Sequence, residues 1–213
     1  MILGMPIKGQ IILGLLFLHH YCVPVVMTPK NIKPHTANHP HRSLSMTHLI
    51  DLTSDRLFRH MAWANAQTFA VLASLPETTF VACEPGNDWS VGMITAHLAE
   101  AATSYASRLD GMPYADLPFD AVSTHAELAI AAAACATADA RLRVSAHTPD
   151  GVVVRQDNPA LTRARTTVLA QTIHHATEHR AQIAGALIAN GVTALNLDDL
   201  DVWAFGDAEG LGA

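Results

Sequence analysis

Two histidines near the C-terminal end of the sequence have the spacing of a metal-binding pair. His175 and His179 lie in a run from about Arg165 to Asn190 whose residues mostly favour a helix, and Gly191 follows as a stop signal. In a helix the two imidazoles would lie one turn apart and only about 40° apart around the axis. Such a pair can bind one divalent ion. His174 would point about 100° away from His175, so we do not expect it to join the pair.

A metal site also needs a ligand from another element, and His97 is the candidate. The sequence contains 13 histidines, so a chance pair at this spacing is easy to find. His97 follows Asp88 and Ser90, either of which can cap a helix, and it would lie about two turns into that helix. Its expected face also carries small and apolar residues. The alternative is therefore a core histidine that makes one hydrogen bond.

Three segments, in this order, resemble the DinB/YfiT-like family of metal-dependent proteins, which is unrelated to the DNA polymerase of similar name. The segments carry Trp63 and Asn65, then Trp89-Ser90-Val91 with His97-Leu98, and finally His175, His179, Arg180 and Gln182. The resemblance covers about Ser54 to Trp203. It implies a four-helix bundle with a three-histidine metal site formed by His97, His175 and His179.

The apolar pattern and the stop signals predict an all-α chain. We expect helices over about 54–75, 90–110, 123–147 and 165–190, the third of them capped by Asp120 or Ser123. Val152–Val154 is compatible with a short extended piece. After Gly191, we expect a tail that packs Leu200, Val202 and Trp203 across the bundle. Four amphipathic helices without a series of strands indicate a helical bundle.

The first fifty residues differ from the rest of the sequence. We expect residues 1–50 to be a disordered or non-native extension and residues 51–213 to be the helical domain. The apolar segment Ile11–Leu18 is too short to span a bilayer, and Lys30–His48 is rich in Pro, His, Asn, Ser and Thr. One hypothesis is that translation begins at Met46, and the alternative is a secretory leader.

Composition excludes several classes of function. A formal net charge of −6 argues against a general nucleic-acid binder, which needs a basic face. Cys22, Cys83 and Cys135 are scattered and odd in number, which indicates a reducing, cytoplasmic location rather than a disulfide framework. The sequence has no Gly-rich phosphate loop, no nucleophile elbow and no repeated Glu-x-x-His set of the ferritin type. We expect a small-molecule substrate and neither nucleic acid nor membrane as partners, and homodimer formation stays open.

Three neutral imidazoles would leave a divalent ion with open positions, at which it could activate water or act as a Lewis acid. Zn and Ni both suit imidazole ligands. The resemblance implies a metal-dependent enzyme acting on a small molecule. It would be a hydrolase or a transferase that uses a low-molecular-weight thiol such as mycothiol or bacillithiol. The alternative is a metal-binding stress-response or regulatory bundle without catalysis.

Four side chains near the expected ligands have weaker signals, and none of them is assigned a catalytic role. Glu100 and Glu178 each lie about 60° from a ligand and could act as a base, although a surface carboxylate is the simpler interpretation. Gln182 shares the ligand face and could orient water or a ligand. Arg180 points away from the ligands, which favours an ion pair or an interface.

Overall fold

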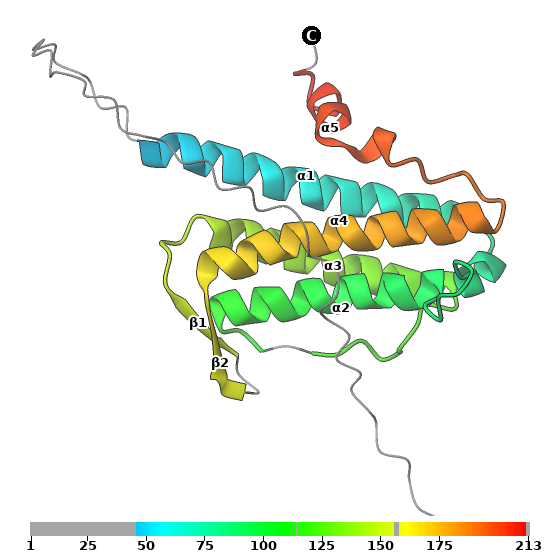
Figure 1. Ribbon diagram of the computed structural model, residues 1–213, viewed down its shortest axis with the longest axis horizontal. Coiled ribbons are helices and arrows are strands. Elements are labelled where there is room, and N and C mark those ends of the chain that lie inside the picture. The colour runs from blue at the N-terminus through cyan, green and yellow to red at the C-terminus, as the bar shows by residue number, and fades with distance from the viewer. Residues whose placement is uncertain (1–45, 114, 156–157, 212–213) are drawn as a thin grey trace, which may run out of the picture. The chain divides into compact units, whose positions relative to one another are not determined.

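The architecture is a bundle of four long helices. A computed structural model describes residues 46–113, 115–155 and 158–211. Its long helices are α1 (Met46–Ser74), α2 (Val91–Asp110), α3 (His125–Ala146) and α4 (Arg165–Ala189). Helices α1 and α2 each pack against both α3 and α4, so α1 and α2 are diagonal partners in the bundle (Figure 1). The predicted four-helix bundle is confirmed, whereas the predictions made for residues 1–45 lie outside the described part of the chain.

Local sequence signals account for the boundaries of α2. The hydroxyl oxygen of Ser90 accepts a hydrogen bond from the backbone N–H of Met93 at 3.2 Å, which satisfies one of the free donors in the first turn. Gly111 ends the helix in the left-handed conformation, with φ of 74°, which glycine adopts without steric cost. The expected span of this helix is therefore correct.

Two helix starts differ from the expectation. Helix α1 begins at Met46 rather than near Ser54, because no Pro or Gly between them interrupts the helix. Asp55, next to the expected start, binds Arg143 on α3 at 2.7 Å. Helix α3 is capped by Thr124 rather than by Asp120 or Ser123. Thr124 and Glu127 form a reciprocal capping box, in which each side chain accepts a hydrogen bond from the other residue's backbone N–H.

The connection between α2 and α3 crosses directly over the start of α2. The backbone N–H of Val122 donates to the carbonyl oxygen of Gly92 at 3.0 Å. A Cβ atom at position 92 would lie 2.0 Å from the carbonyl oxygen of Val122, so only glycine permits this crossing. This close contact fixes the position of the first turn of α2, the helix that carries His97.

A small antiparallel hairpin precedes α4. Strand β1 (Val152–Arg155) pairs with β2 (Asn158–Ala164), and Val152 lies opposite Ala164. The extended piece expected at Val152–Val154 is thus present, but its partner strand was not expected. The β2 sequence contains Pro159 and lacks a run of β-branched residues, so it carries only a weak strand signal.

The C-terminal tail packs on α1 through Leu200 and Phe205, of which only Leu200 was expected. A short 3₁₀ segment, η1 (Glu77–Val81), lies between α1 and α2. A second one, η2 (Asp198–Leu200), follows α4 and leads into the short helix α5 (Val202–Ala208). Leu200 and Phe205 are buried, and the ring of Phe205 lies 5.5 Å from that of Trp63. Trp203 is 84% exposed and Val202 is also exposed, so the predicted packing of these two residues is wrong. Trp203 and Phe205 are two positions apart in the helix, so their side chains point about 200° apart around its axis, and the indole turns toward solvent.

Candidate metal centre

Neighbouring helices bring the three predicted histidines together. His97 lies on α2, and His175 and His179 lie one turn apart on α4. The Nε2 atom of His175 is 3.3 Å from that of His97 and 3.0 Å from that of His179. One ligand atom from each residue can be chosen so that all three lie within 4.8 Å of one another. The cluster can therefore hold a metal ion.

Gln182 determines which nitrogen of His179 faces the cluster. The side-chain oxygen of Gln182 lies 2.6 Å from Nδ1 of His179, so Nδ1 carries the proton and donates a hydrogen bond to that oxygen. In a neutral imidazole the other nitrogen, Nε2, then has its lone pair free. Because Nε2 points at the other two histidines, the amide fixes both the tautomer and the ring orientation, as partners of metal-binding histidines commonly do.

Burial holds the three imidazoles in the neutral form that binds metals. Burial, followed by the neighbouring His179 and His97, lowers the pKa of His175 to about 4. The pKa of His97 is also lowered, first by burial and then by His179. Burial lowers the pKa of His179 as well, although Gln182 and the carboxylate of Glu178 oppose the shift. At neutral pH the three imidazoles are therefore uncharged, and each has one nitrogen lone pair that can bind a metal.

Aromatic rings frame the cluster. The Trp89 indole stacks on His179, with ring centres 6.1 Å apart and planes at 13°, and meets His97 edge-on at 5.0 Å. The edge of Tyr105 on α2 meets His175 at 5.5 Å. The loop holds Trp89 in place because the backbone N–H of this residue donates to the side-chain oxygen of Asn87 at 3.0 Å. The rings limit how far the imidazoles can turn.

The donor set fits a divalent ion. Two imidazole nitrogens bound to one tetrahedral zinc ion at about 2.0–2.1 Å would lie roughly 3.3 Å apart, close to the separations of 3.0 and 3.3 Å. Without a cation or proton between them, lone pairs at these distances repel one another. In the part of the chain that the structure describes, no Cys, Asp, Glu or further His joins the group. Three protein ligands are typical of catalytic sites that keep an open position, whereas structural zinc sites use four.

The neighbouring residues are arranged largely as expected. His174 is exposed and lies outside the group, and Glu178 is an exposed carboxylate. Glu100 is half-buried, and burial raises the pKa of its carboxyl group, whereas a hydrogen bond with the backbone of Leu117 acts to lower this pKa. Tyr105 carried no sequence signal, because a single tyrosine on a helix has no recognisable spacing to the histidines.

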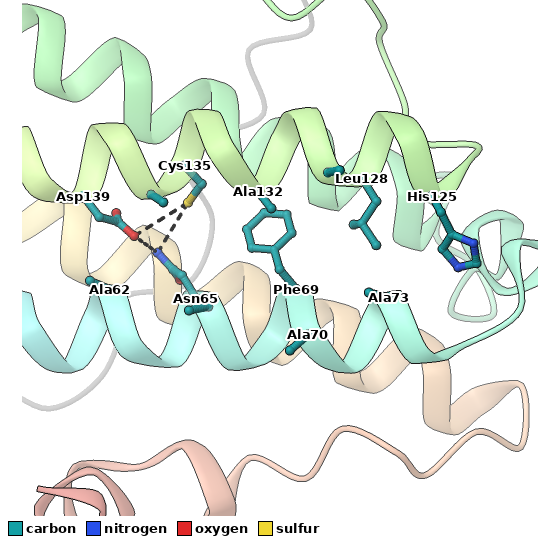
Figure 2. A pocket seen from close by; sticks show the side chains of 13 residues that line it. Ala62, Asn65, Phe69, Ala70, Ala73, His125, Leu128, Ala132, Cys135 and Asp139 are labelled. Carbon is teal, nitrogen blue, oxygen red and sulfur yellow. Dashed lines mark hydrogen bonds between the residues drawn. The ribbon is translucent and has the colours of Figure 1, made fainter.

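A second polar cluster, which we call the Arg180 cluster, joins Arg180, Asn65, Asp139 and Cys135 beside the centre. Arg180 is almost fully buried and donates to the side-chain oxygen of Asn65 at 2.7 Å. The amide nitrogen of Asn65 donates to Oδ2 of Asp139 at 3.0 Å, and the Cys135 thiol lies 3.7 Å from the same oxygen (Figure 2). The sequence indicated an ion pair or an interface for Arg180, but nothing in it singled out Asp139. The i, i+4 spacing of Cys135 and Asp139 on an alanine-rich helix is the signal that could have done so.

Comparison with known proteins agrees with the architecture. No helix within the described ranges is both long and apolar enough to cross a membrane. Among curated proteins, none matches the sequence closely enough to count as a relative. The model of the DinB family matches residues 46–205, from the first residue of α1 into α5. This span includes the four bundle helices and all three clustered histidines, and the chain belongs to the DinB family.

Proposed function

We propose that His97, His175 and His179 bind one divalent metal ion and that the chain is a metal-dependent enzyme acting on a small molecule. The observation that carries the proposal is the convergence of three neutral imidazoles, without a fourth protein ligand among the described residues. Zn and Ni are the ions that best suit an all-imidazole set. A bound ion would supply Lewis acidity, which activates water or a thiol and polarises a carbonyl group.

The proposed reaction is a hydrolysis or a transfer that uses a low-molecular-weight thiol such as mycothiol or bacillithiol. The resemblance of the sequence to the family supports these two classes, and the donor set is compatible with both. Gln182 would keep Nε2 of His179 available to the ion, and the rings of Trp89 and Tyr105 would keep the imidazoles in place. We assign no residue a proton-transfer role.

Access to the cluster supports an enzyme. His97 and His175 are partly exposed, and near them Trp89 and Met93 are 39% and 37% exposed, so side chains do not seal the cluster from solvent. A small molecule could reach the three histidines from this side. Three scattered cysteines and the negative charge support a cytoplasmic protein that does not bind nucleic acid.

One observation favours the second candidate function, a metal-binding stress-response or regulatory bundle without catalysis. A cavity of about 380 Å³ between α1 and α3 does not touch any of the three histidines. A second cavity reaches His175 but measures only about 10 Å³, enough for about one water molecule. An enzyme of this type would need its substrate to bind in the open region beside Trp89.

Metal analysis followed by a reaction screen tests the proposal. The protein is purified without a histidine tag, its metal content is measured, and it is assayed with small-molecule substrates in the presence and absence of mycothiol and bacillithiol. We expect about one divalent ion per chain and metal-dependent turnover that chelation abolishes and added Zn or Ni restores. Stoichiometric metal without turnover would favour the non-catalytic bundle, and the absence of metal binding would contradict both functions.

A further inference from the structure

A cavity lined by residues of α1 and α3 lies between these helices, and we call it the α1–α3 groove. Its volume of about 380 Å³ falls in the range of small-molecule sites. Alanines from both helices form most of its walls, and the buried side chains of Phe69 and Leu128 lie between them (Figure 2). Walls of this kind favour an aliphatic body and exclude charge.

One end of the groove is polar. Asn65, Cys135 and Asp139 meet there, whereas His125 lines the opposite end (Figure 2). Asn65 and the Cys135 thiol both interact with Oδ2 of Asp139. His125 is exposed, and its Nε2 atom lies 2.9 Å from the carbonyl oxygen of Leu75. The two ends therefore differ, because the deep end is buried and acidic and the other end opens to solvent.

The second carboxyl oxygen of Asp139 points to a ligand. Asp139 is only 2% exposed, yet no group in the described residues donates a hydrogen bond to its Oδ1 atom. A buried oxygen without a donor is costly, and native proteins rarely leave one unsatisfied. Asp139 lines the groove, and a donor that reaches this enclosed oxygen from the groove would complete its hydrogen bonding. An anionic head would be repelled there.

We infer that the α1–α3 groove binds a small molecule that has an aliphatic body and a hydrogen-bond-donating head, a hydroxyl or an amino group, which meets the carboxyl group of Asp139. Alanine walls contact the body, and the orphan oxygen accepts from the head. Asn65 and Asp139 also line the small cavity that reaches His175, but none of the three histidines lines the groove. Binding in it should therefore not require a metal.

Three probes of equal chain length test the choice of head group. Octanol, octylamine and octanoate are titrated separately into the full-length, metal-depleted protein, and the alanine methyl groups are followed by NMR. We expect saturable shifts at groove alanines such as Ala66, Ala70 and Ala132 with octanol or octylamine, and binding at least about tenfold weaker for octanoate, which offers no donor. Comparison of the first two probes shows whether a hydroxyl or an ammonium group is preferred. Equal binding of octanoate, or no saturable binding of any probe, would overturn the inference.

Two variants and one control localise the binding. Asp139→Ala removes the acceptor and should weaken the binding of octanol or octylamine at least about tenfold. The same variant should bind octanoate at least as tightly as the original protein does. Ala132→Leu adds volume at a half-buried position in the groove wall and should weaken the binding of all three probes. Ala133→Leu, on the exposed face of α3, should leave their binding unchanged. Should Asp139→Ala fail to fold, the pair at positions 132 and 133 still decides. Equal affinities for Ala132→Leu and Ala133→Leu would place the probes outside the groove.

Discussion

His179 and Arg180 are consecutive residues of α4, yet they belong to polar clusters of opposite character. His179 faces His97 and His175. Arg180 belongs to the Arg180 cluster, which reaches α1 through Asn65 and α3 through Asp139. Burial lowers the pKa of every histidine in the first cluster, so like groups meet in their neutral form. In the Arg180 cluster a cation and a carboxyl group share the interior.

The two clusters show that burial has different consequences for like and unlike groups. Neutral imidazoles that converge present lone pairs that a bound cation can satisfy, so this cluster can take an exchangeable partner. In the Arg180 cluster, burial lowers the pKa of Arg180 to about 10 and raises that of Asp139 to about 6. Both shifts disfavour the charged forms, and Asn65 connects the two groups by hydrogen bonds to each of them. The first cluster is therefore suited to binding an ion, whereas the second joins three helices and leaves one carboxyl oxygen of Asp139 without a donor among the described residues.

The largest expected effect is the loss of metal binding in His175→Ala. His175 contacts both other histidines, so its removal leaves only two ligands. We expect the affinity for Zn or Ni to fall more than about 100-fold, because even partners outside the ligand set commonly contribute 10–100-fold. Calorimetric titration of the untagged, metal-depleted protein measures it. His174→Ala is the matched control, since that side chain is exposed and outside the group, and equal affinities of the two variants would contradict the assignment.

The next largest effect is expected in the Arg180 cluster. Arg180→Met keeps the length of the side chain but removes the cation and the donor to Asn65. Breaking a buried pair leaves its partner uncompensated, so the free energy of unfolding should fall by about 3–5 kcal/mol in denaturant titrations. Arg163→Met, at an exposed position, should change it by less than about 0.5 kcal/mol. A loss below about 1 kcal/mol for Arg180→Met would show that the cluster does not hold the helices together.

The pH dependence of stability should identify the buried carboxyl group. The pKa of Asp139 is about 6 when folded and near 3.8 when unfolded, so between these values the folded state binds more protons. The contribution of this group is thus fully present below about pH 4 and is lost as the pH rises through 6. Asp139→Asn removes the dependence, so the difference in unfolding free energy between the two proteins should change by about 2–3 kcal/mol across this interval. Parallel pH profiles would contradict the raised pKa.

The pair within the histidine cluster could be predicted because its information is local. A spacing of four residues places His175 and His179 on one helix face, whereas the residues alone left His97 as either a ligand or a core histidine, and the resemblance to the family implied its place in the cluster. The start of α1 and the cap of α3 were harder to predict. Several residues near Ser54 and Ser123 can cap a helix, and only the folded environment decides which of them does.

The Arg180 cluster could not be predicted in the same way. Asn65, Asp139 and Arg180 come from three helices and have no mutual spacing in the sequence. Their meeting depends on the axial positions of the helices, which the packing of the whole core sets. Trp203 illustrates the same limit, because a large apolar residue suggests burial but the orientation of a short helix exposed it. Patterns within one element were thus predictable, and contacts among several elements were not.

The smallest expected effect concerns the amide that orients His179. Gln182→Leu keeps a side chain of similar volume but removes the oxygen that accepts from Nδ1. His179 can then adopt the other tautomer or turn, which reduces the fraction of molecules whose Nε2 lone pair faces the cluster. We expect metal affinity to fall about 10–100-fold, or about 1.4–2.7 kcal/mol.

A comparison with stability separates this orienting role from a merely structural one. In the metal-depleted protein, loss of a single partly buried hydrogen bond should cost only about 0.5–1.5 kcal/mol of unfolding free energy. Gln67→Leu, at an exposed position of α1, should leave both metal affinity and stability near their original values. If Gln182→Leu lowered stability but left the affinity unchanged, Gln182 would support packing rather than the ligand geometry. The histidine cluster would then depend on burial and the surrounding aromatic rings alone.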